Sequence, residues 1–150
     1  MKKFVSNNPK ELKKIAKDLA GNLMSRSRLD MGGGALVLAL VGDLGSGKTT
    51  FARAFAEGLG VKEKIKSPTF IIFRKSNIKN KNFLYFYHFD VYRINSEKEI
   101  LNLGWKEIIS NPENIVLAEW ADKIEKILPK NCIKINFKHL KGDKREMEID

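Results

Sequence analysis

The sequence predicts an α/β fold with a mostly parallel central sheet, flanked by helices and edged by antiparallel hairpins. Two continuous apolar runs, residues 35–41 (Ala-Leu-Val-Leu-Ala-Leu-Val) and 115–118 (Ile-Val-Leu-Ala), have the length and composition of strands buried on both faces. Stretches with helical spacing of apolar residues lie beside these runs, which is typical of α/β domains. With 150 residues, the chain is expected to form a single domain over residues 1–150.

The first helix is expected to begin at Pro9. Asn8 is a suitable N-cap residue, and Glu11, at the third helical position, completes a capping box. Apolar residues then recur at helical spacing, namely Leu12, Ile15, Ala16, Leu19, Ala20 and Leu23. The run 35–41 that follows predicts a buried strand.

The middle of the chain predicts a helix followed by a hairpin. A second helix is expected from about Lys48 to Leu59, directly after a glycine-rich loop, with Gly60 as its C-cap. Residues 69–73 and 83–90 are β-branched or aromatic, as in strands. The polar tract 75–82 between them is typical of a hairpin loop.

The last third of the chain predicts two short helices and three strands. Residues 96–99 (Ser-x-x-Glu) form a second capping box, which indicates the start of a helix. A buried strand is expected over 114–120, and another short helix over 122–128. Alternating apolar and polar residues over 133–138 predict a half-exposed strand, and residues 146–149 predict a last one.

Composition excludes several classes of protein. A lone cysteine, Cys132, permits neither an intrachain disulfide nor a zinc cluster built on cysteines. The N-terminus turns polar too early for a signal peptide, and the longest clean apolar run, 35–41, is far shorter than the ~20 residues of a membrane span. We therefore expect a cytoplasmic protein without membrane contact.

The chain is strongly basic, with 28 Lys and Arg against 18 Asp and Glu and a net charge of +10. The densest basic stretches are residues 62–81 and 130–145. Such stretches contact RNA or an acidic protein in some proteins and only face solvent in others. The charge by itself leaves both interpretations open.

Residues 42–49, Gly-Asp-Leu-Gly-Ser-Gly-Lys-Thr, fit the phosphate-binding pattern G-x-x-x-x-G-K-[ST]. Glycines let the backbone turn so tightly that successive N–H groups point at phosphate oxygens, and the helix starting at Lys48 adds its positive end. Lys48 is expected to reach the β- and γ-phosphates, and the Thr49 hydroxyl to ligate Mg²⁺. The Thr50 hydroxyl either lies near the α-phosphate or simply packs.

Two of the predicted strands end in an acidic residue. The strand at 83–89 ends at Asp90, and the run 115–118 ends at Glu119. Ligands of open α/β sheets bind at the carboxyl ends of strands, so both acids are expected to face the phosphates. Glu119 follows the cleaner buried run and is the better candidate for the metal. For each acid alone, a surface residue at a strand end is the alternative.

Three further residues have both a functional and a structural interpretation. Pro68 keeps the chain extended and leaves the Thr69 hydroxyl available to the γ-phosphate or Mg²⁺, as in a switch loop, but a threonine at the start of a strand is equally common. His88 lies two residues before Asp90, so both side chains point the same way in a strand, or His88 simply packs. Trp120 is expected to report on bound nucleotide or to pack in the core.

Four segments carry a more specific signal. They are residues 42–50 (Gly-Asp-Leu-Gly-Ser-Gly-Lys-Thr-Thr), 67–70 (Ser-Pro-Thr-Phe), 87–93 (Tyr-His-Phe-Asp-Val-Tyr-Arg) and 119–120 (Glu-Trp). Their order and spacing resemble the TsaE family (also called YjeE), small bacterial ATPases of tRNA threonylcarbamoyladenosine synthesis. The third and fourth segments are the specific ones, because many families share the phosphate loop. Ser46, where alanine is common, and the long polar hairpin depart from the family.

The resemblance implies a P-loop NTPase-like fold and an ATP hydrolase that depends on Mg²⁺. The residues implied to bind ATP are Gly45, Ser46, Gly47, Lys48, Thr49 and Thr50. Thr49 and Glu119 would hold Mg²⁺, and Thr69 would lie in a switch-I-like loop. Asp90 would orient or deprotonate the attacking water, and Lys48, Thr69, Asp90 and Glu119 would be the catalytic residues. Residues 8–12 would lie near the adenine.

The resemblance also implies partners, the TsaD and TsaB proteins. TsaD transfers the threonylcarbamoyl group to adenosine in tRNA, and the ATPase would reset that complex between rounds and could meet tRNA through it. Turnover by the chain alone is expected to be weak, because a switch loop can require a partner to close.

Two alternatives stay open at this point, a small P-loop kinase and a basic nucleic-acid-binding module. A kinase would need an acceptor pocket and additional arginines, whereas a binding module would show salt-dependent binding without an effect of ATP. A GTPase is disfavoured because no Asn-Lys-x-Asp segment occurs in the chain.

Overall fold

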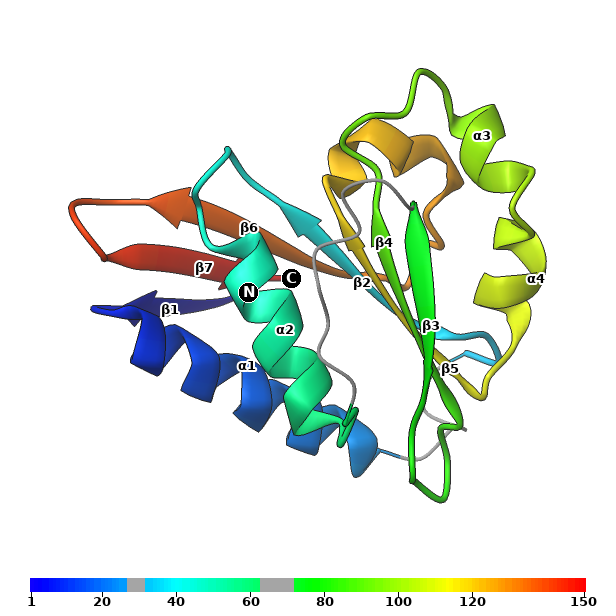
Figure 1. Cartoon of the computed structure of the whole chain (residues 1–150), viewed down its shortest axis with the longest axis horizontal. Coiled ribbons are helices and arrows are strands. Elements are labelled where there is room, and N and C mark those ends of the chain that lie inside the picture. Colours follow the sequence, from blue (N-terminus) through cyan, green and yellow to red (C-terminus); the bar gives the residue numbers. More distant parts are fainter. Residues whose placement is uncertain (27–31, 63–71) are drawn as a thin grey trace.

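A mixed seven-stranded sheet forms the centre of the computed structural model, which describes residues 1–26, 32–62 and 72–150 (Figure 1). The strands are β1 (Lys2–Ser6), β2 (Leu36–Val41), β3 (Phe73–Asn77), β4 (Tyr85–Asp90), β5 (Asn114–Glu119), β6 (Ile133–His139) and β7 (Arg145–Ile149). They lie in the order β1-β7-β6-β2-β5-β4-β3.

The four central strands are parallel and the outer strands are antiparallel. β6, β2, β5 and β4 form the parallel centre, whereas β7, β1 and β3 add antiparallel edges. The α/β class and the edge hairpins are therefore confirmed. The expected mostly parallel arrangement holds only for the centre of the sheet, because half of the pairings between the described strands are antiparallel. The pairing of β1 with β7 also places the two ends of the chain side by side, with Lys2 opposite Ile149.

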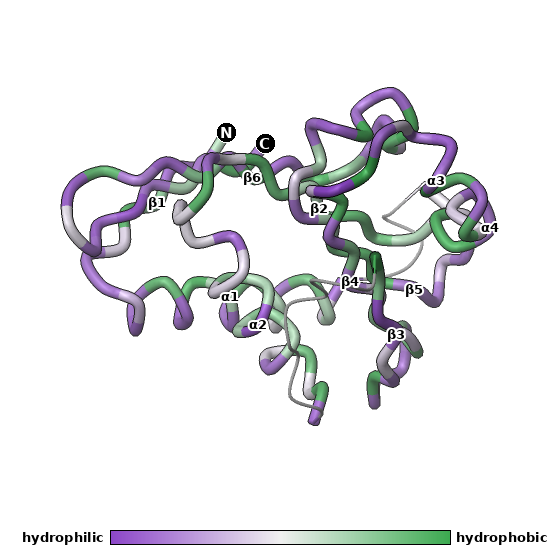
Figure 2. Tube along the Cα trace, turned by 45° about the horizontal axis from the view of Figure 1, so that its top comes forward, coloured by the Kyte–Doolittle hydropathy of each residue, from purple (hydrophilic) through white to green (hydrophobic). Residues whose placement is uncertain are grey.

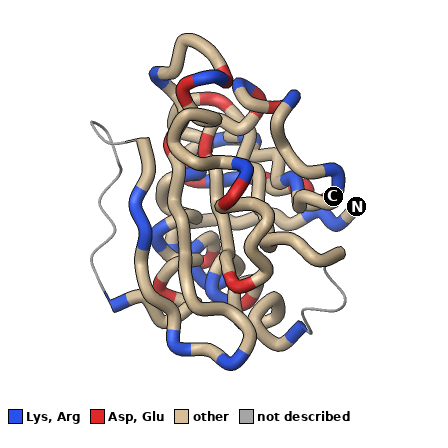
Figure 3. The backbone as a smooth tube through the Cα atoms, turned by 90° about the vertical axis from the view of Figure 1, so that its right-hand side faces the viewer, with Lys and Arg blue, Asp and Glu red and all other residues tan. Residues whose placement is uncertain are grey.

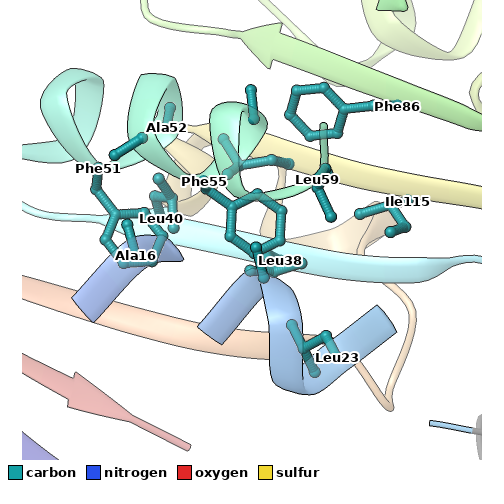
Figure 4. Packing of buried hydrophobic residues seen from close by; sticks show 14 of the residues in the cluster. Ala16, Leu23, Leu38, Leu40, Phe51, Ala52, Phe55, Leu59, Phe86 and Ile115 are labelled. Carbon is teal, nitrogen blue, oxygen red and sulfur yellow. The ribbon is translucent and has the colours of Figure 1, made fainter. Parts of the chain in front are cut away.

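Two helices, α1 (Pro9–Met24) and α2 (Lys48–Gly58), lie side by side over one face of the sheet (Figure 1). Both are amphipathic, and in Figure 2 the trace of α1 alternates between hydrophobic and hydrophilic stretches. Figure 4 shows Phe51 and Phe55 of α2 among Leu38, Leu40 and Ala16, all of which are buried. Burial of each large apolar side chain is worth ~1.5–3 kcal/mol, so this face anchors α2 firmly on β2.

The opposite face is covered by three short helical segments, α3 (Glu97–Leu101), α4 (Trp105–Ser110) and the 3₁₀ segment η2 (Ala121–Ile127). Trp105 is fully buried there, its ring edge-on to Phe89 with 5.1 Å between the ring centroids. The Trp105 Nε1–H donates to the Ile127 carbonyl at 3.0 Å, which satisfies its polar atom in the core.

The predicted helix starts are largely confirmed. The Asn8 side chain accepts the Glu11 backbone N–H at 2.9 Å, and α1 begins at Pro9. The Glu11 carboxylate reaches back to the backbone N–H of Asn7 at 2.7 Å rather than to that of Asn8, so the capping box is shifted by one residue. The second box begins α3 as expected, with Glu99 accepting the Ser96 N–H at 3.4 Å.

Two sequence expectations are corrected, and a third falls partly on residues that the structure does not describe. The tract 75–82 is not all loop, because β3 extends to Asn77, where an edge strand tolerates polar side chains and Lys75 covers the Tyr85 ring at 4.0 Å. Residues 69–71 of the strand expected there lie outside the described residues. The helix expected at 122–128 is instead the 3₁₀ segment η2, which is kinked at the buried Ile124, a residue with non-helical dihedral angles (φ −122°, ψ 24°).

Sequence analysis missed β1 and α4. β1 is an edge strand in which only Ser6 is buried, so it lacks a clear apolar pattern. Its Lys3 forms ion pairs with Glu146 and Glu148 of β7, at 3.6 and 3.2 Å, which only the folded chain brings together. α4 follows Gly104, which adopts φ 90°, and its six residues are too few for a helical period to show.

The positive charges of the described residues are spread over several sides of the molecule. In Figure 3 the Lys and Arg positions occur at the top, at the bottom and on both sides of the view. Several lysines are also paired, among them Lys17 with Glu57 at 3.1 Å and Lys134 with Glu125 at 2.7 Å. Within the described ranges, no helix combines the length and the apolar character needed to cross a membrane.

Candidate functional site

A cleft with a volume of about 200 Å³ opens where the loop after β2 meets the start of α1 and the β6–β7 hairpin. Its walls come from segments that are far apart in the chain. The lining residues are Asn8, Pro9, Leu12, Leu44, Gly45, Gly47, Lys48, Thr49, Thr50, Trp120, Asp143 and Arg145. Five of the six residues implied to bind ATP are among them.

The loop at 42–47 has a backbone that requires glycine at two positions. A Cβ on Gly42 would lie 2.6 Å from the Phe137 carbonyl oxygen, so any side chain there would collide with β6. Gly47 has φ 105° and caps α2, and a Cβ there would lie 2.9 Å from Leu12 Cδ2. The glycines therefore let the loop fit tightly against β6 and α1, with the N-terminus of α2 facing the cleft.

Lys48 is 4% exposed and its amine lies at the centre of the loop. Nζ donates to the carbonyl oxygens of Gly42 at 2.5 Å and Asp43 at 2.7 Å, and to Ser46 Oγ at 3.1 Å. Burial lowers the pKa of Lys48, while the negative charges of Glu119 and Asp43 oppose that shift. A phosphate in the cleft would offer this amine a stronger, charged acceptor than a backbone carbonyl.

Trp120 covers the Lys48 amine. Its ring centroid lies 4.0 Å from Lys48 Nζ, a cation–π contact, and 4.6 Å from the ring centroid of Tyr92. Trp120 adopts φ 61°, the left-handed conformation that a bulky residue adopts only when its surroundings enforce it. The turn directly after Glu119 thus places the indole in the wall of the cleft, where it also packs against the core on the side of η2.

Glu119 is bonded on both carboxylate oxygens although it is 1% exposed. Thr49 Oγ1 donates to Oε1 at 2.7 Å, and the other oxygen, Oε2, is 2.6 Å from His88 Nε2. His88 is also 1% exposed, and its ring is stacked against Phe86 with 6.3 Å between the centroids. His88 is therefore more than a packed residue, because it holds the Glu119 carboxylate against Thr49.

Asp90 lies beside Glu119 because β4 and β5 are parallel and in register at their carboxyl ends. The Asp90 carboxylate accepts the backbone N–H of Tyr92 at 3.1 Å. Burial raises the pKa of Asp90, and the nearby charge of Glu119 raises it further. A carboxylate with a raised pKa is a better proton acceptor than an ordinary one.

The substitution Asp90→Asn is expected to raise the Tm at neutral pH by about 2 °C. The raised pKa means that ionised Asp90 is disfavoured in the folded protein, and asparagine keeps the bond to Tyr92 without the charge. The folded state binds the Asp90 proton more readily than the unfolded state does. The wild type therefore gains stability as the pH falls from the raised pKa of the folded protein toward 3.8, the ordinary pKa of an aspartate. Melting curves at neutral pH and near pH ~4 should show the advantage of the variant shrinking. A variant less stable than the wild type at neutral pH would contradict this account.

The residues at this end of the sheet suit a magnesium ion. Mg²⁺ binds through one or two protein oxygens and completes its shell with phosphates and water. Thr49 Oγ1 and Glu119 Oε1 are already 2.7 Å apart, next to the glycine-rich loop at 42–47. A hydroxyl and a buried carboxylate in this arrangement fit that ion.

Most of the residues predicted from the sequence come together here. Gly45, Gly47, Lys48, Thr49 and Thr50 line the cleft, and Ser46 lies buried behind Lys48. Glu119 is connected to the cleft by its hydrogen bond with Thr49, and Asp90 lies next to Glu119 on the neighbouring strand. Thr69 lies outside the described residues, so its expected place in a switch loop stays a prediction.

Sequence reasoning missed Asp143 and Arg145. Both stand near the β6–β7 turn, in a stretch that was noted only for its positive charge. Neither belongs to a motif, and the one available signal was that Arg145 is an arginine in a chain dominated by lysine. Asn8, Pro9 and Leu12, which the resemblance placed near a base, do line the cleft.

Comparisons with known proteins agree on one family. The family model described as "Threonylcarbamoyl adenosine biosynthesis protein TsaE" matches residues 6–147. A tRNA threonylcarbamoyladenosine biosynthesis protein TsaE from Bacillus subtilis is 40% identical over 145 residues, covering 97% of this chain and 82% of the relative. A protein of the same name from Haemophilus influenzae is 36% identical over 115 residues, covering 77% of this chain and 70% of the relative. The crystal structure of Bacillus subtilis YdiB superposes with a TM-score of 0.70 at 33% identity, covering 99% of this chain and 83% of that one.

Proposed function

The chain belongs to the TsaE family of tRNA threonylcarbamoyladenosine biosynthesis proteins, and on that basis we propose that it is an Mg²⁺-dependent ATPase serving this modification. The observation that carries the proposal is the meeting of Lys48, Thr49 and Glu119 at one cleft. Lys48 and the loop amides would bind the β- and γ-phosphates, and the Thr49 and Glu119 oxygens would hold the metal. These are the parts that phosphoryl transfer from ATP to water requires.

Each residue has a defined task in this reaction. When bound, Mg²⁺ would offset the negative charge of the β- and γ-phosphates. Lys48 would place a positive charge where the leaving ADP oxygen becomes negative as its bond to the γ-phosphorus breaks. Asp90 would orient the attacking water and accept its proton, which its raised pKa favours. His88 would keep Glu119 turned toward Thr49, since it occupies the other carboxylate oxygen.

The nucleoside would lie on the wall formed by the start of α1. Asn8, Pro9 and Leu12 supply a mixed polar and apolar surface next to the phosphate loop, and the resemblance expects the adenine there. Trp120 lines the same cleft, so its fluorescence should change when nucleotide binds. Trp105 is buried on the other side of the sheet and would not respond.

We further propose that turnover is coupled to the TsaD and TsaB proteins, which would be reset by hydrolysis, and that tRNA is met through that complex. Among the described residues, Lys and Arg lie on several sides of the molecule, which is in keeping with an indirect role (Figure 3). The chain alone is expected to hydrolyse ATP slowly.

Phosphate release from Mg-ATP, by the chain alone and with TsaD and TsaB added, tests this proposal. We expect slow release alone, at least about tenfold faster release with the pair, and none when EDTA removes Mg²⁺. A reaction in which the pair is mixed without the chain serves as the background. Release that is neither stimulated by the pair nor dependent on Mg²⁺ would contradict the proposal.

A further inference from the structure

Arg145 connects the C-terminal hairpin to the phosphate loop, although it belongs to none of the predicted motifs. It is the first residue of β7, and its Nη1 donates to the carbonyl oxygens of Gly142 at 2.8 Å and Lys144 at 3.1 Å. These two bonds hold the guanidinium against its own turn. Its Nε then donates to the carbonyl oxygen of Gly45, a hundred residues away, at 3.2 Å.

The turn that carries Arg145 is itself well ordered by hydrogen bonds. The Lys144 N–H donates to the Lys141 carbonyl at 3.0 Å, and the Leu140 N–H donates to the Lys144 carbonyl at 3.0 Å. The Gly142 carbonyl lies 2.6 Å from Nε2 of His139, which stands opposite Arg145 in the hairpin register. These hydrogen bonds hold the turn in one conformation, from which the Arg145 guanidinium reaches the Gly45 carbonyl.

The aliphatic part of Arg145 packs on a second glycine of the loop. A Cβ on Gly47 would lie 3.7 Å from Arg145 Cγ on one side and 2.9 Å from Leu12 Cδ2 on the other. The loop is thus held between α1 and the hairpin. Both the head and the stem of Arg145 contribute to this contact.

The bond to Gly45 fixes the orientation of one peptide group. The same peptide carries the Gly45 carbonyl and the Ser46 N–H, and the latter donates to the Asp43 carbonyl at 3.1 Å. Gly45 has φ 77°, and a glycine there allows its peptide to rotate at little cost. A carbonyl oxygen turned into the loop would present its partial negative charge to a phosphate and repel it, whereas the N–H groups of the loop attract a phosphate.

We propose that Arg145 is a positioning residue of the nucleotide site, which holds the Gly45 carbonyl outside the phosphate cradle. This inference rests on the proposed nucleotide binding and adds the β6–β7 hairpin to that site. The guanidinium fork is essential to this role, because one group must bond the turn and the loop together. A lysine amine is a point charge on a flexible stem and cannot reproduce that geometry.

Binding by isothermal titration calorimetry tests the proposal with three ligands in Mg²⁺, namely ATP, ADP and inorganic triphosphate. The variants are Arg145→Met, which keeps a similar stem, and Arg145→Lys, which keeps the charge. Lys144→Met is the matched control, since it removes a neighbouring exposed charge and leaves the backbone carbonyls in place. Melting curves establish whether each variant is folded. If Arg145→Met does not fold, binding by Arg145→Lys alone tests the proposal.

We expect both Arg145 variants to bind all three ligands about tenfold more weakly, the effect of losing one charge-assisted hydrogen bond, and the control to stay within about twofold of the wild type. Wild-type affinity in Arg145→Lys would show that only the charge matters, which overturns the proposal. A loss confined to ATP and ADP would mean a contact with the nucleoside and would also overturn it. A wild-type chain that binds none of the three ligands would instead overturn the proposed function.

Discussion

Replacement of Lys48 by alanine is expected to lower ATP hydrolysis by about a thousandfold. Lys48 is the one buried amine in the described part of the cleft, and its Nζ lies among the Gly42 and Asp43 carbonyls, next to Ser46 Oγ. Its charge is needed most when negative charge develops on the leaving oxygen, so the loss should appear chiefly in kcat. Phosphate release under saturating Mg-ATP, with TsaD and TsaB present, measures it.

The same substitution should leave the fold intact. Burial lowers the pKa of Lys48, and relief of this burial cost offsets part of the loss of its hydrogen bonds to Gly42, Asp43 and Ser46. A Tm within a few degrees of the wild type is expected. Lys13→Ala, which removes an exposed lysine from α1, is the matched control and should hydrolyse ATP normally. Full activity of the Lys48 variant would contradict the assignment of the phosphate loop.

Replacement of Glu119 by glutamine is expected to remove the effect of Mg²⁺ on nucleotide affinity and to lower hydrolysis at least about a hundredfold. The carboxylate accepts Thr49 Oγ1 on one oxygen and faces His88 Nε2 with the other. An amide has one oxygen and one NH₂ group, so it cannot accept on both sides. The variant therefore loses the metal ligand and also the bond that orients it.

Nucleotide titrations of Glu119→Gln with Mg²⁺ and with EDTA measure the first effect. In the wild type, Mg²⁺ should tighten ATP binding, whereas the variant should bind ATP equally with and without it. The variant should also lose ~1–3 kcal/mol of folding stability, because one buried polar group is left without a partner. Glu107→Gln, an exposed position on α4, is the control. A variant that still responds to Mg²⁺ as the wild type does would show that Glu119 is not a ligand.

Local signals in the sequence predicted the elements that position the glycine-rich loop at 42–47. The buried run at 35–41 became β2, and the glycine-rich loop and α2 follow it as expected. Asn8 caps α1 as its residue type indicates. These predictions succeed because capping, glycine conformation and apolar period depend on residues within a few positions of one another.

Elements without a local signal were missed or misplaced. β1 has only Ser6 buried, and its partner β7 is at the other end of the chain. The polar end of β3 is a strand only because β4 pairs with it. In each case, a distant partner decides the conformation and the residues themselves do not.

The sequence by itself determined that a glycine-rich loop with the phosphate-binding pattern stands between a buried strand and a helix, and that two strands end in Asp90 and Glu119. Only the tertiary structure decided what these groups meet. The register of β4 against β5 places Asp90 beside Glu119, and the packing of α2 on the sheet brings Thr49 to the Glu119 carboxylate. The return of the chain in β7 carries Arg145 to Gly45. Strand order and register arise from hydrogen bonds and burial between segments far apart in the chain, so no short stretch of sequence encodes them.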